Sequence, residues 1–334
     1  MTNTINLNEF YKDKNILITG GLGFIGSNLV IKLVELGSNV TIMDSLIPDF
    51  GGSFYNISSV TGKVKVDISD MRDSHSLEKL VPEKDIIFNL AGQVSHEDGM
   101  VDPVMDLDIN AKSQLYLLEA VRKSNPRAKI VYAGTRQIYG KIENTPVNEL
   151  HLVRPSDTNG VSKFAGEWYH ILYNQVYGIP TTSLRLTNTF GPRQLMKHAR
   201  QGFIPYFIKL ALDDQEIPIY GDGTQIRDMN YIDDVVEAFL LAGSSNKSDG
   251  QYYNLGGIIP ITLLDFVKEL ITSAGSGKYQ LVPFPVDRKK IDIGDYVGDF
   301  SKIKRELGWE PKIGIVEGIK KTVEYYKANK KYYW

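Results

Sequence analysis

The chain has 334 residues, of which 42% are hydrophobic and 23% charged, and its formal net charge is -2. This balance is typical of a globular protein with a large core, and it excludes a basic footprint for nucleic acid. The absence of cysteine excludes disulfides, thiolate nucleophiles and cysteine-based metal sites, and the 5 scattered histidines show no ligand spacing, so we predict no metal.

The amino-terminal segment MTNTINLNEFYKDKN is polar and charged, unlike a signal peptide. No apolar run approaches the roughly 18–20 residues that span a bilayer. We therefore expect a cytoplasmic protein without a membrane partner. The closing segment YYKANKKYYW is interpreted as a solvated surface.

Strand-like and helix-like segments alternate through the first half of the chain. Strands are predicted at 15–19, 39–43, 63–66, 85–90, 129–133 and 181–186, and helices at 24–36, 74–80, 107–123 and 161–177. This alternation favours an α/β fold, a Rossmann-type doubly wound parallel sheet with helices on both faces.

Beyond residue 186, prolines and the segment YGDGTQ interrupt the pattern, before a helix at 232–243 and a strand at 251–255. We interpret these two elements as a return to the sheet. The predicted domains are therefore 1–185 plus about 228–256 for the dinucleotide, and about 186–227 plus 257–334 for a smaller C-terminal α/β substrate domain.

The segment GGLGFIG, residues 20–26, lies between the first strand and the first long helix. Gly20, Gly23 and Gly26 allow a tight turn, through Phe24 and Ile25, that brings pyrophosphate to a helix N-terminus. A glycine triplet alone also fits a flexible turn, but the strand before it and the helix after it favour a dinucleotide site.

Acidic and small residues at the ends of the following strands extend this prediction. Asp44 ends the second strand, where a carboxylate binds the ribose hydroxyls and repels a 2′-phosphate, so NAD is favoured over NADP. Asp67, with Ile68, is expected to contact the adenine. Leu90, Ala91 and Gly92 end the fourth strand and let the backbone approach the cofactor, although a packed strand end would look similar.

Several motifs in order resemble the extended short-chain dehydrogenase/reductases that act on nucleotide sugars: TGGLGFIG, AGQVSHEDGMVDP, AGTRQIYG, LRLTNTFGP, YGDGTQIRDMNYIDDV and SKIKRELGWEP. The resemblance runs along nearly the whole chain. It implies a nucleotide-diphosphate sugar as the substrate and a homodimer joined through two helices of each subunit. It also implies a Ser/Thr, a Tyr and a Lys four residues later as the hydride-transfer residues.

These three family positions map to Thr135, Asn159 and Lys163. A side-chain amide has no proton to lose near neutral pH, so Asn159 cannot act as the general base that the family's tyrosine provides. Two residues are candidates to replace it. Lys163 would need a pKa lowered by burial, and His96 lies in the loop after the fourth strand, which approaches the cofactor in this family.

The family's 4,6-dehydratases have an Asp–Glu pair after the Ser/Thr, which removes water across C5 and C6. Here the corresponding residues are Arg136 and Gln137, neither of which transfers protons at neutral pH. Ordinary dehydration is therefore disfavoured. Arg136 and Gln137 are instead predicted to bind the substrate, Arg136 through a carboxylate or phosphate, although Arg136 could also pair with a surface acid.

Three further residues match the family's substrate-binding positions: Asn188, Arg227 and Arg288, the last with Asp292 nearby. Arg227 is expected to bind the nucleotide diphosphate or, alternatively, to form a salt bridge with Asp228 or Asp233.

The leading hypothesis is an NAD-dependent NDP-hexose epimerase that acts through transient oxidation at C4. The alternatives are an NDP-sugar 4-oxidoreductase or atypical dehydratase, and a sugar-nucleotide-binding protein that has lost turnover.

Overall fold

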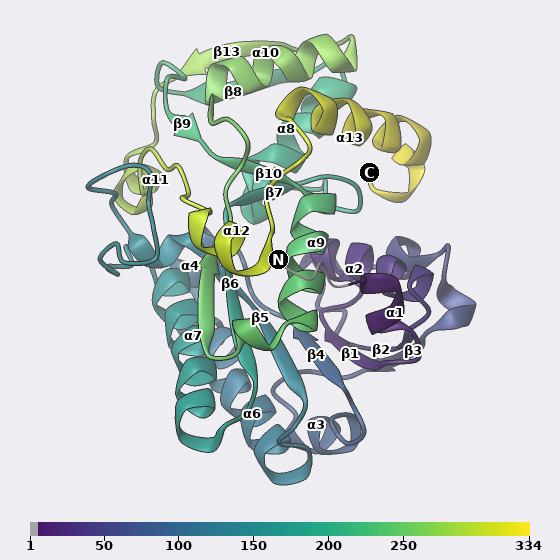
Figure 1. Ribbon diagram of the computed structural model, residues 1–334. Helices are drawn as coiled ribbons and strands as arrows, with labels where there is room; N and C mark the ends of the chain where they lie inside the picture. Colours follow the sequence, from purple (N-terminus) through teal and green to yellow (C-terminus); the bar gives the residue numbers. More distant parts are fainter. Residues whose placement is uncertain (1–5) are drawn as a thin grey trace.

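A computed structural model describes residues 6–334, and its centre is a sheet of seven parallel strands in the order β11-β6-β5-β4-β1-β2-β3 (Figure 1). The strands are β1 (Asn15–Thr19), β2 (Asn39–Asp44), β3 (Lys65–Ile68), β4 (Ile86–Asn89), β5 (Lys129–Thr135), β6 (Thr181–Leu186) and β11 (Gln251–Asn254). The order reverses between β1 and β4, as in a doubly wound fold, so the predicted fold class is confirmed.

Successive side chains of the central strands point to opposite faces, and each face builds its own core. Ile16 and Ile18 of β1 belong to one apolar cluster, whereas Leu17 belongs to another. The first face is covered by α1 (Leu7–Tyr11), α2 (Phe24–Glu35) and α9 (Ile232–Ser244), the second by α3 (Ser74–Leu80), α6 (Ser113–Ser124) and α7 (Thr158–Tyr177). Strands buried on both faces explain the continuous apolar runs of the sequence.

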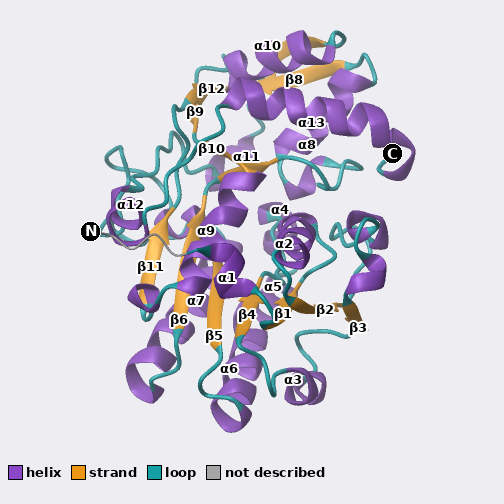
Figure 2. Ribbon diagram, turned by 45° about the vertical axis from the view of Figure 1, so that its right-hand side comes forward, coloured by secondary structure: helices purple, strands orange, loops and turns teal. Residues whose placement is uncertain are grey.

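A second region lies above the carboxyl ends of the strands (Figures 1 and 2). It contains three two-stranded pairs, β7 (Asn188–Phe190) with β10 (Met229–Tyr231), β8 (Glu216–Tyr220) with β13 (Lys278–Val282), and β9 (Ile226–Arg227) with β12 (Ile261–Thr262). Its helices are α8 (Phe203–Leu212), α10 (Leu263–Ala274), α11 (Val286–Ile291), α12 (Ser301–Leu307) and α13 (Ile315–Asn329). Among the helices of residues 6–334, none combines the length and apolar character needed to cross a membrane.

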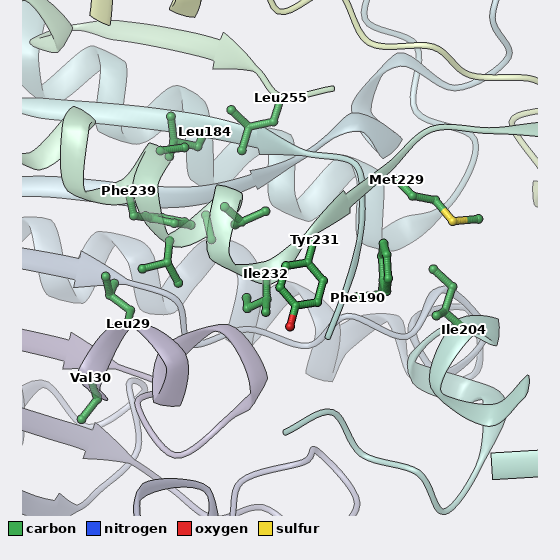
Figure 3. Close-up of a cluster of buried hydrophobic side chains, with 14 of the residues drawn as sticks. Leu29, Val30, Leu184, Phe190, Ile204, Met229, Tyr231, Ile232, Phe239 and Leu255 are labelled. Carbon is green, nitrogen blue, oxygen red and sulfur yellow. The ribbon is translucent and has the colours of Figure 1, made fainter. Parts of the chain in front are cut away.

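One apolar cluster joins the two regions. Figure 3 shows Leu29 of α2 and Phe239 of α9 in the same cluster as Phe190 of β7 and Ile204 of α8. All four side chains are at most 3% exposed. The two regions are therefore packed through shared apolar side chains rather than joined by a solvated linker.

The predicted helix at 107–123 is wrong in its continuity. The chain forms α4 (His96–Val101), α5 (Pro103–Leu107), a π-helical turn (Asp108–Lys112) and then α6. Such turns are frequent at functional sites, and here Asn110, inside the turn, is fully buried beside the candidate site. The third strand also begins two residues later than predicted, because residues 61–63 form a short 3-10 turn.

Several aromatic side chains of the closing Lys/Tyr segment are packed against the protein, so its lysines and Tyr332, rather than the whole segment, form the solvated surface that the composition indicates. Tyr326 is fully buried, and Tyr333 is 8% exposed, with its hydroxyl 2.7 Å from Oδ1 of Asn56. Tyr332 stacks on Tyr55, with the ring centroids 3.7 Å apart. The end of the chain thus contacts the loop between β2 and β3.

Candidate active site

A cavity of about 960 Å³ lies at the carboxyl ends of the sheet strands, where ligands bind in open α/β sheets. Its wall includes 17 of the 19 predicted site residues: Gly20, Gly23, Phe24, Ile25, Gly26, Asp44, Leu90, Ala91, Gly92, Thr135, Arg136, Gln137, Asn159, Lys163, Asn188, Arg227 and Arg288. Asp67 and Ile68 lie outside the wall, which instead contains the next residues along the chain, Ser69 and Asp70.

The glycine loop packs too tightly for side chains at two positions. Gly20 has φ +68°, and a Cβ there would lie 2.9 Å from the backbone nitrogen of Ala91. A Cβ on Gly26 would lie 2.1 Å from the carbonyl oxygen of Gly20. Gly23 is the N-cap of α2 and supplies no side-chain capping group, so the first N–H groups of that helix are left for an anion. The loop therefore fits the pyrophosphate of a dinucleotide.

Asp44 is held beside this loop by two backbone contacts. Its Oδ2 accepts a hydrogen bond from the N–H of Leu22 at 3.0 Å, and its Oδ1 accepts one from Leu46 at 2.9 Å. Burial raises the pKa of this carboxyl, while the two hydrogen bonds oppose the shift. The carboxylate lies at the cavity wall, where it can accept hydrogen bonds from ribose hydroxyls.

A chain of polar contacts connects Thr135 to His96. The Oγ1 of Thr135 accepts a hydrogen bond from the backbone N–H of Gln137 at 3.2 Å, and Nε2 of Gln137 donates to Oδ2 of Asp157 at 2.7 Å. The same Oδ2 lies 3.0 Å from Nδ1 of His96. Burial alone would raise the pKa of Asp157, but the contacts with His96, Gly160 and Gln137 outweigh it and lower the pKa.

Asn159 belongs to a buried network of amides and one carboxylate. Its Nδ2 donates to the carbonyl oxygen of Gln93 at 2.8 Å and to Oδ2 of Asp106 at 3.1 Å. Asn110 donates to the same two acceptors, at 2.9 and 3.2 Å. Because both amide hydrogens of Asn159 have acceptors, its Oδ1 is the atom left for a ligand at the cavity wall.

Lys163 lies one helical turn after Asn159 on α7 and is 7% exposed. Its Nζ lies 4.4 Å from the centroid of the Tyr132 ring. Burial lowers the pKa of Lys163 to about 8, against the opposing negative charges of Asp106 and Glu167. A substantial fraction of this amine is therefore neutral near physiological pH.

Two predicted arginines pair with acids from distant segments. The Nη2 of Arg227 lies 3.5 Å from Oδ1 of Asp292, so the alternative of a salt bridge with Asp228 or Asp233 is wrong. Arg288 contacts Glu97 with two nitrogens, Nε at 2.6 Å and Nη2 at 3.1 Å, and its Nη1 donates to the hydroxyl of Tyr220 at 2.9 Å. The Glu97–Arg288 pair joins α4 to α11.

Several residues of the site were not predicted from the sequence. Asp106 and Asn110 are spaced i, i+4, which places them on one helical face, and this signal was available. Asp157 is the N-cap of α7, and an Asp just before a predicted helix could also have been found. Glu97 gave no signal, because its partner lies 191 residues away.

A doubly wound sheet with a glycine loop, an acid after β2, and Thr and Lys side chains at the same cavity defines a dinucleotide-binding oxidoreductase-type site. The family described as GDP-mannose 4,6 dehydratase matches residues 17–322. The chain therefore belongs to the extended short-chain dehydrogenase/reductase family of nucleotide-sugar epimerases and dehydratases, as its motifs predicted.

Relatives of both reaction types are similar over nearly the full length. A putative UDP-glucose 4-epimerase from Methanocaldococcus jannaschii is 34% identical, over 94% of this chain and 99% of the relative. A dTDP-glucose 4,6-dehydratase from Actinoplanes sp. is 28% identical, over 95% and 99%. The structure of a UDP-glucose 4-epimerase with UDP-glucose from Thermotoga maritima has a TM-score of 0.85 at 32% identity, covering 94% and 99%.

Proposed function

We propose that this protein is an NAD-dependent NDP-hexose epimerase that acts through transient oxidation at C4. The observation that carries the proposal is that the cavity wall contains the residues for one reaction of the family and lacks those for the other. Thr135 and Lys163 are present for hydride transfer, whereas positions 136 and 137 hold a guanidinium and an amide. In addition, the side-chain amide of Gln137 is held by its 2.7 Å hydrogen bond to Asp157. The cavity wall therefore contains side chains for the oxidation step, but it lacks the acid/base pair that would eliminate water.

NAD, held by the glycine loop and Asp44, would accept and return the hydride. Thr135 Oγ1 accepts a hydrogen bond from the Gln137 N–H, so its own proton is available for donation to the sugar oxygen. Asn159 presents its Oδ1 as an acceptor and orients the sugar hydroxyl without removing its proton. Its amide is fixed in this orientation by Gln93 and Asp106.

Lys163 is the proposed carrier of the hydroxyl proton. Its pKa of about 8 allows it to take up and release a proton near neutral pH, which Asn159 cannot do. His96 is the second candidate, because it lies at the cavity wall and its Nδ1 is 3.0 Å from the carboxylate of Asp157. Variants separate the two, since Lys163→Met removes the first carrier and His96→Gln the second.

The experiment is an incubation of the NAD-loaded protein with UDP-, GDP-, CDP- and dTDP-hexoses, both neutral and oxidised to the acid at C6, followed by NADH absorbance and by NMR of the sugar. We expect a C4 epimer to form with no net NADH. The control is Thr135→Val, which keeps the side-chain shape and removes the hydroxyl. Stoichiometric NADH with a 4-keto sugar would instead indicate the oxidoreductase, and binding without any product would refute both enzyme functions.

We also propose a homodimer formed through α5 and α7. On α7, Trp168, Leu172 and Val176 are 47, 41 and 60% exposed, and on α5 Val104 is 66% exposed. Contiguous apolar side chains on neighbouring helices are typical of a protein interface. Trp168→Glu should convert a dimer to a monomer in light scattering, and a monomeric wild-type protein would exclude this interface.

A further inference from the structure

Unlike the other arginines of the cavity wall, Arg136 forms no salt bridge within residues 6–334. Arg227, Arg288 and Arg200 of the cavity wall each lie within salt-bridge distance of a carboxylate, those of Asp292, Glu97 and Asp49 respectively. Arg136 instead donates from Nη2 to the neutral Oδ1 of Asn188 at 2.9 Å and lies 5.1 Å from the centroid of the Tyr296 ring. Within residues 6–334, no carboxylate forms a salt bridge with it.

The surroundings of this guanidinium disfavour its charge. Burial lowers the pKa of Arg136 to about 10, and the nearby charge of Arg227 adds to the shift, whereas Tyr296 and the carboxylates of Asp228 and Asp292 oppose it. A partly buried cation without a salt-bridge partner is unfavourable, and a second cation nearby increases the cost. Such an arrangement becomes favourable when a ligand brings an anion into the cavity, of which Arg136 forms part of the wall.

The position of Arg136 indicates which part of the ligand carries that anion. Arg136 directly follows Thr135, the proposed donor to the reacting sugar oxygen, on the sheet side of the cavity. Arg227 and Arg288 belong to β9 and α11 of the second region, the wall where we propose that the diphosphate binds. A ligand group that contacts Arg136 therefore lies next to the proposed position of the reacting sugar oxygen.

We infer that Arg136 binds a carboxylate on the sugar ring, so that the substrate is a nucleotide uronic acid. This inference rests on the proposed function. The planar fork of a guanidinium matches a carboxylate with two parallel hydrogen bonds, and Asn188 holds one edge of the group in place. Neutral hexoses leave the cation of Arg136 unpaired and bind more weakly.

The test begins by finding which of UDP, dTDP, GDP and CDP binds the NAD-loaded protein most tightly in calorimetry. The glucose and glucuronate derivatives of that nucleotide are then compared, since they differ only in the oxidation of C6. We expect the glucuronate derivative to bind about tenfold tighter or more, the effect of one charge-assisted hydrogen-bonded pair. Arg136→Gln should abolish this preference and leave the affinity for the nucleoside diphosphate unchanged.

Arg227→Gln is the matched control, because it should weaken the nucleoside diphosphate and both sugars alike. The same uniform loss in Arg136→Gln, or a wild-type protein without preference for the uronate, would overturn the inference. If the sugars bind with the expected preference but neither is turned over, the proposed function fails and the inference stands. If no nucleotide sugar binds, both fail.

Thermal unfolding without the sugar nucleotide gives a second readout. Because no carboxylate within residues 6–334 forms a salt bridge with Arg136, Arg136→Gln should keep or raise Tm. An arginine with a purely structural role would lower Tm when replaced, and that result would count against a ligand-binding role.

Discussion

Asn159→Asp tests the buried network directly, because it replaces an amide donor with an acid while keeping the shape of the side chain. In the wild-type protein, Nδ2 of Asn159 lies 3.1 Å from Oδ2 of Asp106, and Asp106 is 1% exposed. Two carboxylates at this distance cannot both ionise, so the folded variant must hold a proton between them.

The free-energy cost of holding that proton sets the expected loss in the free energy of unfolding. Holding a proton at pH 7 on an acid with an ordinary pKa near 3.9 costs about 1.4 kcal/mol per pH unit, or about 4 kcal/mol in total. The folded variant binds more protons than the unfolded chain, so its free energy of unfolding falls as pH rises. The deficit is therefore absent near pH 4 and grows toward pH 7, until the raised pKa of the pair is passed.

The assay is urea denaturation of the wild type, Asn159→Asp and Asn159→Ala at several pH values between about 4.5 and 7.5. Asn159→Ala loses the same hydrogen bonds without adding an acid, so its deficit of about 2–4 kcal/mol should not change with pH. If the two variants showed the same pH dependence, Asn159 would not donate to Asp106, and its proposed orientation would be wrong.

Four other changes test separate parts of the site. Asn159→Tyr should lower hydride transfer and not restore it, since a phenol ring displaces the buried network; increased NADH formation would contradict this. With Lys163 as the base, the rate should rise with pH through about 8 and level off, and Lys163→Arg should be slow throughout, as stopped-flow absorbance would show. Glu97→Gln should release Arg288 and tighten nucleoside diphosphate binding about two- to fivefold in calorimetry, whereas weaker binding would mean that Glu97 positions the arginine. Tyr333→Phe should cost about 1–2 kcal/mol in urea unfolding, and an unchanged midpoint would show that the tail is not docked through this hydroxyl.

The cofactor half of the site could be predicted from the sequence because its determinants are local. Gly20 and Gly26 lie six residues apart, and the strand and helix that identify them as part of a dinucleotide site are next to them in the sequence. Asp44 needs only the end of the next strand to be located. Asp67 lies outside the cavity wall, which contains Ser69 and Asp70 instead, and its strand begins later than its apolar pattern indicated.

The substrate half depends on contacts that no local pattern encodes. Glu97 and Arg288 are far apart in the sequence, as are Asp157 and His96, and an acid looks the same in sequence whether or not it meets a base. The tail shows the same limit. Its lysines and tyrosines are typical of a solvated surface, but Asn56 offers a buried acceptor to Tyr333, which only the fold could reveal.

The three departures from the family pattern are physically connected. A tyrosinate at position 159 would lie beside the buried carboxylate of Asp106, whereas an amide donates to it and leaves an acceptor for the sugar. An amide at position 137 satisfies Asp157 instead of competing with it as a second acid. With acids absent from positions 136 and 137, the guanidinium of Arg136 has no salt-bridge partner within residues 6–334 and can pair with an anionic ligand. The substitution of one residue alone would leave a buried charge or donor without a partner, so the amides and the arginine form a coherent set adapted to one kind of ligand.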